Sequence, residues 1–598
     1  MNFSSPEGYE PGAAFGNTGM SDASENAIVS NLRGEFLAGV ALLLTLLLSG
    51  CGGNGSSAPS RASVPVITSF GASPAAITAG QTTTLAWLVS GATSVQLSDI
   101  SATPQASSSS VVVVPAATTT YTLTATNSAG STQQSATVTV TVASQIASVQ
   151  INPTAAAVPI PLNFLSIGQQ MGDTLTMVGT SSTNMNPIYE QLLKNLIQYA
   201  NGPLLIRELS DGGNSDVYDA GNLSALSQLN QDLGAQFFIG VDFVDDDVTT
   251  ATGEAQQLVA GLPGAQLQAI ELGNEPDLYE ASYDDYLGQY EAFAPALVSA
   301  SGGIRLSAPV WAGLSSSFMD SLESFISTQA STIAIVTVHH YSGTACNGAT
   351  EPPNYLLTEP AVDGDTQPLT GPVGIPPYLP AAQQAKIPFR IGELNSINCG
   401  GQLGVSNSFS SALWAMDIAF SYANVGVSGI NFFAPGDPNT PNAYTPFDFT
   451  STSNGGVRTY AVRNINPLYY GLLLFAQTVR NNAQLLPVTL TTPTQSKIKA
   501  WATIDTNQTI RLLLLNKDQT ASGPVSIALA GYGQATISRL AAPSFSSTTG
   551  VTLAGQTFDG SADGTAQGTA YAEIIQPSSG VYTVALPAVS AALVSIQP

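Results

Sequence analysis

The sequence AIELGNEPD, residues 269–277, decides the fold. An apolar run leads into Asn274 and Glu275, and Pro276 then stops the strand that the run predicts. This pattern is typical of a buried parallel strand that presents a carboxylate at its carboxyl end. In a (β/α)8 barrel, strand ends of this kind build the active site. We therefore expect Glu275 to lie on the rim of such a barrel.

A second stretch, FRIGELNS at residues 389–396, has the same form and places Glu393 at the end of an apolar run. The two glutamates are 118 positions apart (393 minus 275), which leaves room for about three βα units. Two carboxyl groups on one rim, roughly 5–5.5 Å apart, suffice to hydrolyse a glycosidic bond when one donates a proton and the other attacks the anomeric carbon. The pattern predicts Glu275 as acid/base and Glu393 as nucleophile. A single such glutamate would more simply be structural.

Neighbouring residues suit these roles. Asn274 can hydrogen-bond a sugar hydroxyl next to the reacting carbon. Tyr341, at the end of the sixth apolar run, can donate a hydrogen bond to Glu393, and Arg207 on the second run can keep that carboxylate ionised by charge pairing. Arg390 alternates away from Glu393 along its strand.

Eight apolar runs alternate with helical periodicity, which indicates a (β/α)8 TIM barrel over 162–482. The runs are 162–167, 204–209, 236–243, 267–272, 304–310, 333–338, 389–393 and 429–433. Helices are expected at 222–233, 252–262, 283–300, 318–328, 409–424 and 468–480. The proline-rich segment 342–388 is expected to cover the rim as a lid or substrate wall.

Strand patterns flank the barrel. Residues 64–143 alternate with frequent turns and predict an Ig-like β-sandwich, which we interpret as a spacer; sugar binding is the alternative, with Trp87 as its one evident platform. Residues 144–161 form a linker whose strand at 148–151 is expected to join a later β domain. Residues 483–598 predict a C-terminal β-sandwich.

The 598 residues include 40 acidic and 15 basic side chains, with a net charge of −25. This charge argues against nucleic acid and anionic membrane surfaces as partners. It also repels an acidic substrate at long range, so local donors would have to hold one. Asp242 and the run 245–247 are interpreted as a solvated loop rather than a metal site.

The first 51 residues resemble a bacterial lipoprotein signal, because Arg33 precedes the apolar run 36–48 and LSGC at 48–51 resembles a lipobox. Cys51 would then be lipidated, residues 52–63 would be a flexible tether, and the protein would be exported and anchored to a bacterial membrane on the periplasmic face or the cell surface. A plain cleaved signal is the alternative, and translation from Met20 is possible.

Two cysteines, Cys346 and Cys399, remain after export. An even pair in an oxidising compartment suggests a disulfide that joins two active-site loops. Two separate buried thiols are the alternative.

The chain from about 147 onward resembles glycoside hydrolase family 79, the β-glucuronidases and heparanase relatives. The segments that carry the resemblance are Arg207 with GGNSD at 212–216, ELGNEP at 271–276, ELNSINCGG at 393–401, GVS at 404–406, ALWA at 412–415 and PLYYGL at 467–472. The resemblance implies a retaining exo-β-glucuronidase that acts on glycans without a metal or organic cofactor. We expect a monomer whose membrane contact is a lipid anchor alone.

An acidic sugar could be held by the residues that follow the nucleophile. Gly400 and Gly401 can offer unhindered backbone N–H groups to a carboxylate, and Tyr341 and Asn398 can add donors. A tight turn is the plainer interpretation of the glycine pair. The chain departs from the family at position 433, where phenylalanine stands in place of an expected histidine; Tyr444 is a candidate replacement contact.

Three alternatives stay open. A 4-O-methyl-glucuronidase, an endo-acting heparanase-like enzyme and a neutral-sugar β-glycosidase would all use the same machinery. The scarcity of lysine and arginine favours exo action over an endo enzyme for sulfated chains. A non-catalytic surface carbohydrate-binding protein would be expected to lack one of Glu275 and Glu393, and both are present.

Overall fold

The computed structural model describes residues 63–102, 106–199, 202–209, 220–314, 316–364, 375–436, 443–493 and 496–598. The chain divides into Met1–Arg61 and Ala62–Pro598, and every described residue belongs to the second unit. Cys51, the expected export signal and the 212–216 segment therefore lie outside the described residues. Within the described ranges, no helix is both long and apolar enough to cross a membrane.

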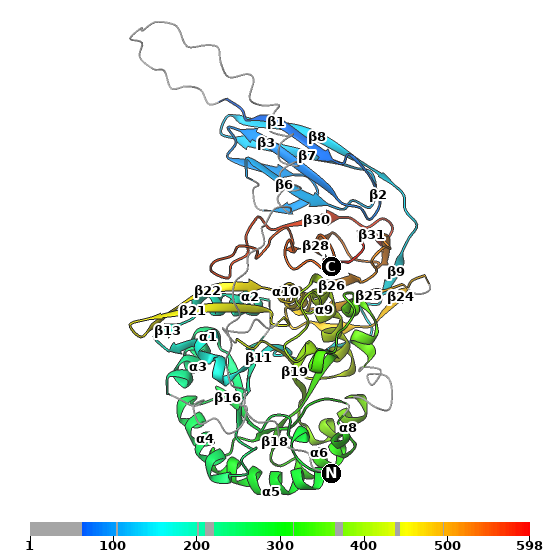
Figure 1. The fold of residues 1–598 in the computed structure, drawn as a ribbon. Helices are drawn as coiled ribbons and strands as arrows, with labels where there is room; N and C mark the ends of the chain where they lie inside the picture. The colour runs from blue at the N-terminus through cyan, green and yellow to red at the C-terminus, as the bar shows by residue number, and fades with distance from the viewer. Residues whose placement is uncertain are drawn as a thin grey trace, which may run out of the picture. The chain divides into compact units, whose positions relative to one another are not determined.

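Eight parallel strands close into a barrel, and each matches one of the eight predicted runs (Figure 1). They are β11 (Leu165–Gln170), β14 (Leu205–Leu209), β15 (Gln236–Val241), β16 (Leu267–Leu272), β17 (Leu306–Trp311), β18 (Ile333–Thr344), β19 (Phe389–Asn398) and β20 (Gly429–Phe433). Closure comes from β20, which pairs in parallel with β11 so that Leu165 lies opposite Ile430. The TIM-barrel prediction is confirmed.

Helices surround this barrel. They are α2 (Pro187–Ile197), α3 (Ala220–Leu233), α4 (Val248–Gly261), α5 (Tyr283–Ala300), α6 (Leu322–Gln329), α8 (Ile375–Ala385), α9 (Phe409–Val425) and α10 (Pro467–Val479). Local sequence fixes several ends: Asn186 and Ser282 accept hydrogen bonds from the first turns of α2 and α5, and Gly426 ends α9 at φ 96°.

The barrel interior changes from apolar to polar toward the carboxyl ends of the strands. The layer near the strand starts is apolar and consists of Leu205, Phe238, Ala269 and Ile335. Two residues further along their strands, Arg207, Glu271 and Thr337 replace them, all fully buried. The period of two along each strand thus raises charged groups from an apolar floor to the active-site end.

Two segments differ from the sequence expectation. A hairpin of β21 (Phe447–Asn454) and β22 (Val457–Ile465) stands between the last barrel strand and α10. Its strands are largely polar, so no apolar run marked it, although the Asn-Gly-Gly turn at 454–456 is a hairpin signal. The 342–388 segment also contains more regular structure than a loop, because β18 continues to Thr344 and α8 packs beside α6.

The C-terminal domain consists of two sheets. The larger contains β23 (Gln484–Leu486), β25 (Ile498–Ile504), β26 (Ile510–Asn516), β28 (Ala535–Ala541), β29 (Thr552–Leu553), β30 (Tyr571–Ile575) and β32 (Ser590–Ile596). The smaller contains β24 (Val488–Thr491), β27 (Gly523–Ala528) and β31 (Val581–Leu586), with β9 (Ala147–Ile151) between β24 and β27. The early strand thus pairs with the C-terminal domain, as predicted. The two-residue strand β10 (Val158–Pro159) covers one edge of the larger sheet.

Residues 66–141 form a smaller pair of sheets around a shared core. One holds β1 (Val66–Ser73), β3 (Thr83–Ser90) and β6 (Ser108–Val113); the other holds β2 (Ala76–Thr78), β4 (Ser94–Leu97), β7 (Thr119–Asn127) and β8 (Gly130–Thr141). Trp87 is 3% exposed and donates its indole N–H to the Ala106 carbonyl, so it offers no sugar platform. Strand β5 (Ile100–Ala102) instead pairs with β30 of the C-terminal domain. The Ig-like class of this sandwich stays a prediction.

A buried ion pair joins α9 of the barrel to the C-terminal domain. Lys517 Nζ lies 2.6 Å from Asp417 Oδ2, and both side chains are fully buried. Trp501 donates its indole N–H to the other oxygen of Asp417 at 3.2 Å and stacks on Phe420 with ring centroids 5.6 Å apart. The two domains therefore share one desolvated contact.

We expect Lys517→Met to destabilise the folded chain by roughly 3–5 kcal/mol, because it leaves Asp417 buried without its cation. The midpoint of urea unfolding, followed by tryptophan fluorescence, measures the effect. Replacing both partners (Asp417→Leu with Lys517→Met) should recover most of the loss. The matched control is Lys194→Met, which breaks an exposed pair with Glu190 and should cost under about 1 kcal/mol. Equal midpoints for the Lys517→Met and Lys194→Met variants would contradict the assignment.

Candidate active site

Arg207 lies at the centre of the site and contacts three acceptors. Its Nε donates to Glu271 Oε1 at 2.7 Å, its Nη1 to Glu393 Oε2 at 2.5 Å and its Nη2 to Asn274 Oδ1 at 2.9 Å. The residue is fully buried on β14. The donors of the planar guanidinium thus hold both glutamates and the amide oxygen of Asn274 in fixed positions around Arg207.

The charges around Arg207 keep it protonated. Burial by itself lowers the pKa of Arg207, but Glu271 and Glu393 outweigh burial and raise that pKa above its ordinary value. Glu271 is further held by the Ser307 hydroxyl at 3.0 Å. One buried cation therefore contacts one oxygen of each of two buried carboxyl groups, and the hydroxyls of Ser307 and Tyr341 donate to the other two oxygens.

Glu393 stands near the middle of β19 and is 6% exposed. Its Oε1 accepts a hydrogen bond from the Tyr341 hydroxyl at 2.5 Å, and its Oε2 faces Arg207. Burial, with the Glu393 charge second, raises the pKa of Tyr341, so the phenol remains a neutral donor. Both oxygens of Glu393 are therefore positioned by donors, one from the neighbouring strand β18 and one from β14 across the barrel, which preorganises the carboxylate.

Glu275 follows the end of β16 in a left-handed conformation, with φ 51°. Its backbone N–H donates to the carbonyl of Val310, which is itself at φ 64°. Positive φ at a non-glycine residue is uncommon, and at a β-branched one more so, which marks this corner as strained. The side chain keeps 23% of its exposure. Burial raises the pKa of Glu275, while Arg207 lowers it, and the net direction is upward.

His339 contacts Glu275, a contact that the sequence analysis missed. Its Nδ1 lies 2.8 Å from Glu275 Oε1 and 4.0 Å from Glu393 Oε2. Burial, with the Arg207 charge second, lowers the pKa of His339 to about 4, so the ring is neutral and its tautomer follows the proton on Glu275. Alternation would have found it, since His339 shares its strand face with Tyr341 two residues on.

Glu275, His339 and Glu393 bring one ligand atom each to within 4.8 Å of one another. Carboxylate and imidazole donors at this spacing can hold a divalent ion. Here one oxygen of Glu393 already faces the Arg207 cation, and His339 Nδ1 faces Glu275 within hydrogen-bond distance. A metal ion bound here would lie beside the Arg207 cation and be repelled by it. The arrangement therefore suits proton transfer better than metal binding.

The turn after β19 is fixed by the expected disulfide. Cys346 and Cys399 are joined, with Cα atoms 5.3 Å apart. Asn398 Oδ1 lies 3.0 Å from the Cys346 sulfur, a contact without a proton because the sulfur is in the disulfide. A Cβ on Gly401, at φ 81°, would stand 2.8 Å from the Tyr444 nitrogen, so the glycine is required for this turn.

An aromatic group forms one wall beside Tyr341. The Tyr341 and Tyr444 ring centroids are 6.0 Å apart, and those of Phe433 and Tyr444 are 6.1 Å apart. Asn395 donates its amide to the carbonyls of Phe433 and Tyr444 and fixes both. Phe433, at the position where the resemblance implied a histidine, thus packs against Tyr444.

Arg390 faces away from this site, as alternation along its strand predicted. Its guanidinium donates to Asn431 Oδ1 at 2.7 Å and to the carbonyls of Asn163, Phe164 and Ile430. Burial lowers its pKa to about 9. The cation at the carboxylates is therefore Arg207, not the arginine that precedes Glu393 in sequence.

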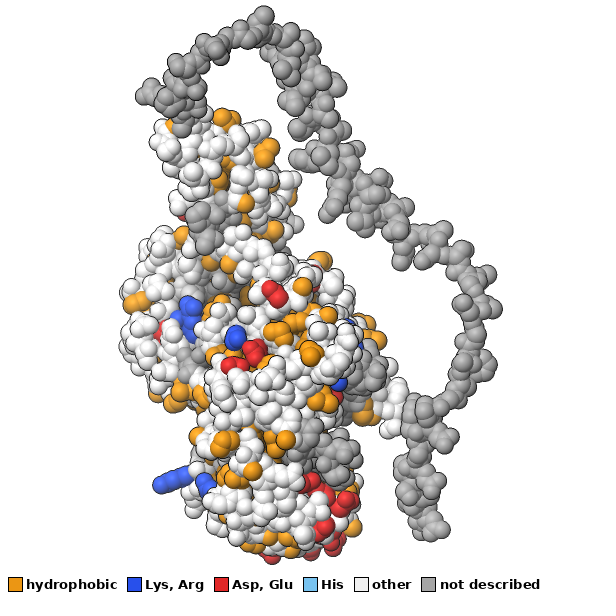
Figure 2. Space-filling model, turned by 90° about the vertical axis from the view of Figure 1, so that its left-hand side faces the viewer, with side chains coloured by type: hydrophobic (Ala, Val, Ile, Leu, Met, Phe, Trp, Pro, Cys, Tyr) orange, Lys and Arg blue, Asp and Glu red, His pale blue; other side chains and the backbone are white. Residues whose placement is uncertain are grey.

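The surface around the barrel is acidic. Figure 2 shows acidic side chains gathered over the barrel at the foot of the view and few basic ones on the same face. With a net charge of −25, an anionic ligand meets a repulsive field at long range. Any acidic group in the site must therefore be held by short-range donors.

The C-terminal domain carries a family signature. Residues 500–593 match the Glycosyl hydrolase family 79 C-terminal beta domain. The sequence is also 26% identical over 322 residues to a β-glucuronidase from Aspergillus niger, a match that covers 44% of this chain. The chain spans 57% of the length of that relative.

Solved structures share the fold. A 4-O-α-L-rhamnosyl-β-D-glucuronidase from Fusarium oxysporum, in complex with Rha-GlcA, superposes with a TM-score of 0.59 at 19% identity and covers 75% of this chain and 99% of its own. A family 51 α-L-arabinofuranosidase from Bifidobacterium longum gives a TM-score of 0.52 at 15% identity, covering 76% of this chain and 100% of its own. At these low identities, the two TM-scores show that the chain shares the fold of these structures.

We expect both histidines of the chain to stay neutral between about pH 7.5 and 5, because burial lowers the pKa of His339 and of His340 to about 4. An unfolded histidine titrates near 6.5, so below that pH the unfolded chain binds more protons and folding stability falls as the pH falls toward about 4. Histidine-selective 15N NMR measures the charge directly.

His340→Phe leaves one imidazole signal and so assigns the signal of His339. Titration of the His339 signal near pH 6.5 would contradict the neutral, buried ring beside Glu275.

Proposed function

We propose that the chain is a glycoside hydrolase, a retaining exo-β-glucuronidase that releases terminal β-linked glucuronic acid from glycans. The observation that carries the proposal is the contrast between its two carboxyl groups, which approach within 4.8 Å. Glu393 lies against the Arg207 cation, while burial raises the pKa of Glu275. A short separation supports the retaining mechanism, since inverting enzymes hold their carboxyl groups roughly 6.5–9.5 Å apart.

In the first step, an oxygen of Glu393 attacks the anomeric carbon and forms a covalent bond as the glycosidic C–O bond breaks. Glu275 transfers its proton to the departing oxygen, which leaves as a neutral alcohol. Asn274 accepts from Arg207 through Oδ1, so its Nδ2 remains as a donor for the hydroxyl next to the reacting carbon. That hydrogen bond strengthens as positive charge develops on the sugar.

In the second step, water attacks the same carbon and breaks the bond to Glu393. Glu275, now ionised, takes the proton of this water and returns to its starting state. His339 positions Glu275 through Nδ1, because its neutral ring can accept a hydrogen bond from the acid form of Glu275. Tyr341 stabilises Glu393 as it leaves the sugar.

The glucuronate carboxylate is assigned to the turn after the nucleophile strand. The disulfide and the close packing of Gly401 on Tyr444 fix this turn. The Gly401 N–H donates to the Asn398 carbonyl at a long 3.4 Å and the Gly400 N–H contacts the Tyr444 hydroxyl, so a sugar carboxylate would replace these two contacts. Short-range donors suit an acidic sugar in a chain whose long-range field repels it. The β-glucuronidase relative and the match of the C-terminal domain support the same sugar. Export and lipid attachment at Cys51 complete the proposal, with the enzyme held on the periplasmic face of a bacterial membrane or on the cell surface.

The test is hydrolysis of 4-nitrophenyl β-glucuronide beside the β-glucoside and β-xyloside, with wild type and Glu393→Gln. We expect turnover of the glucuronide, and a loss of at least about 1,000-fold in the variant because the nucleophile is removed. Asp320→Asn, a change to an acidic residue outside the site, should leave turnover unchanged. Turnover of a neutral sugar alone would overturn the glucuronate assignment. Full activity in Glu393→Gln would overturn the mechanism.

A further inference from the structure

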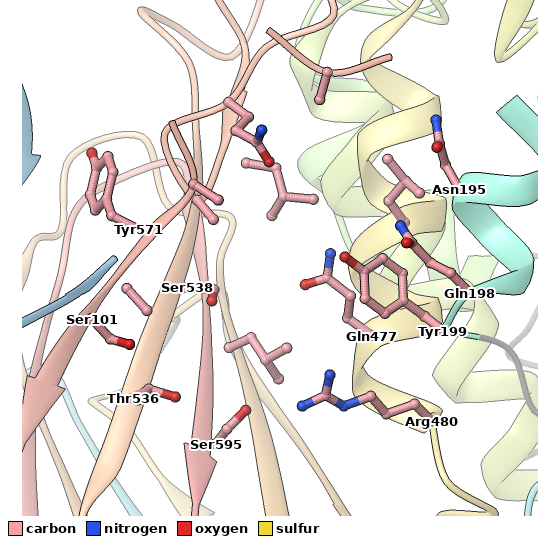
Figure 3. Close-up of a pocket in the computed structure, with 18 of the residues that line it drawn as sticks. Ser101, Asn195, Gln198, Tyr199, Gln477, Arg480, Thr536, Ser538, Tyr571 and Ser595 are labelled. Atoms are coloured by element: carbon pink, nitrogen blue, oxygen red, sulfur yellow. The ribbon is translucent and has the colours of Figure 1, made fainter. Parts of the chain in front are cut away.

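A cavity of about 350 Å³ lies between the outside of the barrel and the C-terminal β domain (Figure 3). Its walls come from the end of α2, the last turns of α10 and the strands β28, β30 and β32. The volume lies within the range of about 300–1,000 Å³ typical of small-molecule sites. None of the residues that form the proposed active site lines it.

The cavity is separate from the catalytic carboxylates. Helix α10 begins beside Tyr444, because Asn466 donates its side chain to the carbonyl of Thr445 and its backbone N–H to that of Pro446. Arg480, in the cavity wall, follows the other end of the helix. Thirteen helical residues span about 20 Å, so the cavity opens at the far end of α10 from the site.

Polar side chains project into this space from both sides. Figure 3 shows Gln477 and Arg480 extending from α10 toward the strands that carry Ser538 and Ser595, with Tyr199 beside them. Arg480 Nε is buried and has no hydrogen-bond partner among the described residues. Arg480 therefore presents a buried donor whose hydrogen bond is open to a ligand.

The charge of the lining is positive. Arg480 is its charged member, and the described lining contains no aspartate or glutamate. This is unusual in a chain with 40 acidic and 15 basic residues. A guanidinium that faces a cavity without a carboxylate is an open site for an anion.

A second guanidinium, that of Arg511, lies outside the lining and interacts electrostatically with Arg480. Arg511 is opposite Ser595 in the sheet register and is 2% exposed. Its Nη2 donates to Asp505 at 2.8 Å, but its Nε and Nη1 have no partner within the described part of the chain. Burial above all, and also the charge of Arg480, lower the pKa of Arg511 against the opposing effect of Asp505. The anion would thus relieve the repulsion between two neighbouring cations.

Apolar groups complete the walls, chiefly Leu473, Leu553, Leu593 and Phe558. Amides, hydroxyls, one guanidinium and apolar faces together match a ring that carries several hydroxyl groups, a C–H face and one carboxylate. A phosphate or sulfate would require more cationic donors and would leave the amides unused. We propose that this cavity binds a uronic-acid residue of a glycan, as a second carbohydrate site apart from the catalytic centre. The choice of sugar rests on the proposed function.

Leucine methyl NMR reads the two sites separately. Leu473 and Leu593 line the cavity, whereas Leu209 packs in the aromatic cluster beside Tyr341. The full chain carrying Glu393→Gln is titrated with methyl β-D-glucuronide, and we expect saturable shifts at all three leucines. Adding Arg480→Gln should weaken the response at Leu473 and Leu593 by about tenfold or more, the loss of one charge-assisted contact, and leave Leu209 unchanged.

Two controls match these variants. Lys194→Gln removes one cation from α2 outside the lining and should change neither response. Methyl β-D-glucoside differs from the probe at the carboxyl group and should bind the cavity at least about tenfold more weakly. The proposal is overturned if Leu473 and Leu593 do not respond, if they respond equally to the glucoside, or if Arg480→Gln changes nothing. Leu473 and Leu593 could also respond while Leu209 does not and the wild type hydrolyses no glucuronide. That result would contradict the proposed function and support the cavity site.

Discussion

The guanidinium of Arg207 contacts Glu271, Glu393 and Asn274 at once, in a layer of the barrel from which water is excluded. Two carboxyl groups in such a layer would be costly without a cation, and a lone cation would be equally costly. The two kinds of group therefore depend on each other, because the carboxylates keep Arg207 charged and Arg207 holds the carboxylates in place. These contacts join β14 to β16 and to β19 across the barrel, so the barrel and the site are fixed by the same side chain.

The third carboxyl group of the site, that of Glu275, has different surroundings. Glu275 sits at a strained corner after its strand, keeps partial exposure and contacts a neutral imidazole. Burial raises the pKa of Glu275. Two neighbouring glutamates thus experience opposite surroundings, one beside a cation and one beside an uncharged ring. An acid and a nucleophile require different protonation states, and environments that push the pKa values of two carboxyl groups apart provide them.

Much of this architecture could be predicted from sequence, because parallel barrel strands are apolar on both faces and stand out as runs. The runs that end in Glu275 and Glu393 also located the carboxylates, and Tyr341 followed from its neighbouring strand. The hairpin at 447–465 was not predicted because most of its strand residues are polar, so that buried Phe447 and Phe449 stand in no apolar run. His339 was not predicted because it directly follows an apolar run without any motif of its own, and only the alternation from Tyr341 shows that it shares the inward face. Arg480 gave no signal, since its cavity forms between a helix and a sheet far apart in sequence.

The most direct test of the account is to trap the covalent intermediate. The wild-type chain is incubated with a 2-deoxy-2-fluoro-β-glucuronyl fluoride, which forms the glycosyl-enzyme quickly and hydrolyses slowly, and the labelled peptide is sequenced by mass spectrometry. The account predicts one added fluoroglucuronyl group, carried by Glu393. A label on Glu275 or Glu271, or an active enzyme that acquires no label, would contradict the assignment of Glu393 as the nucleophile held by Arg207.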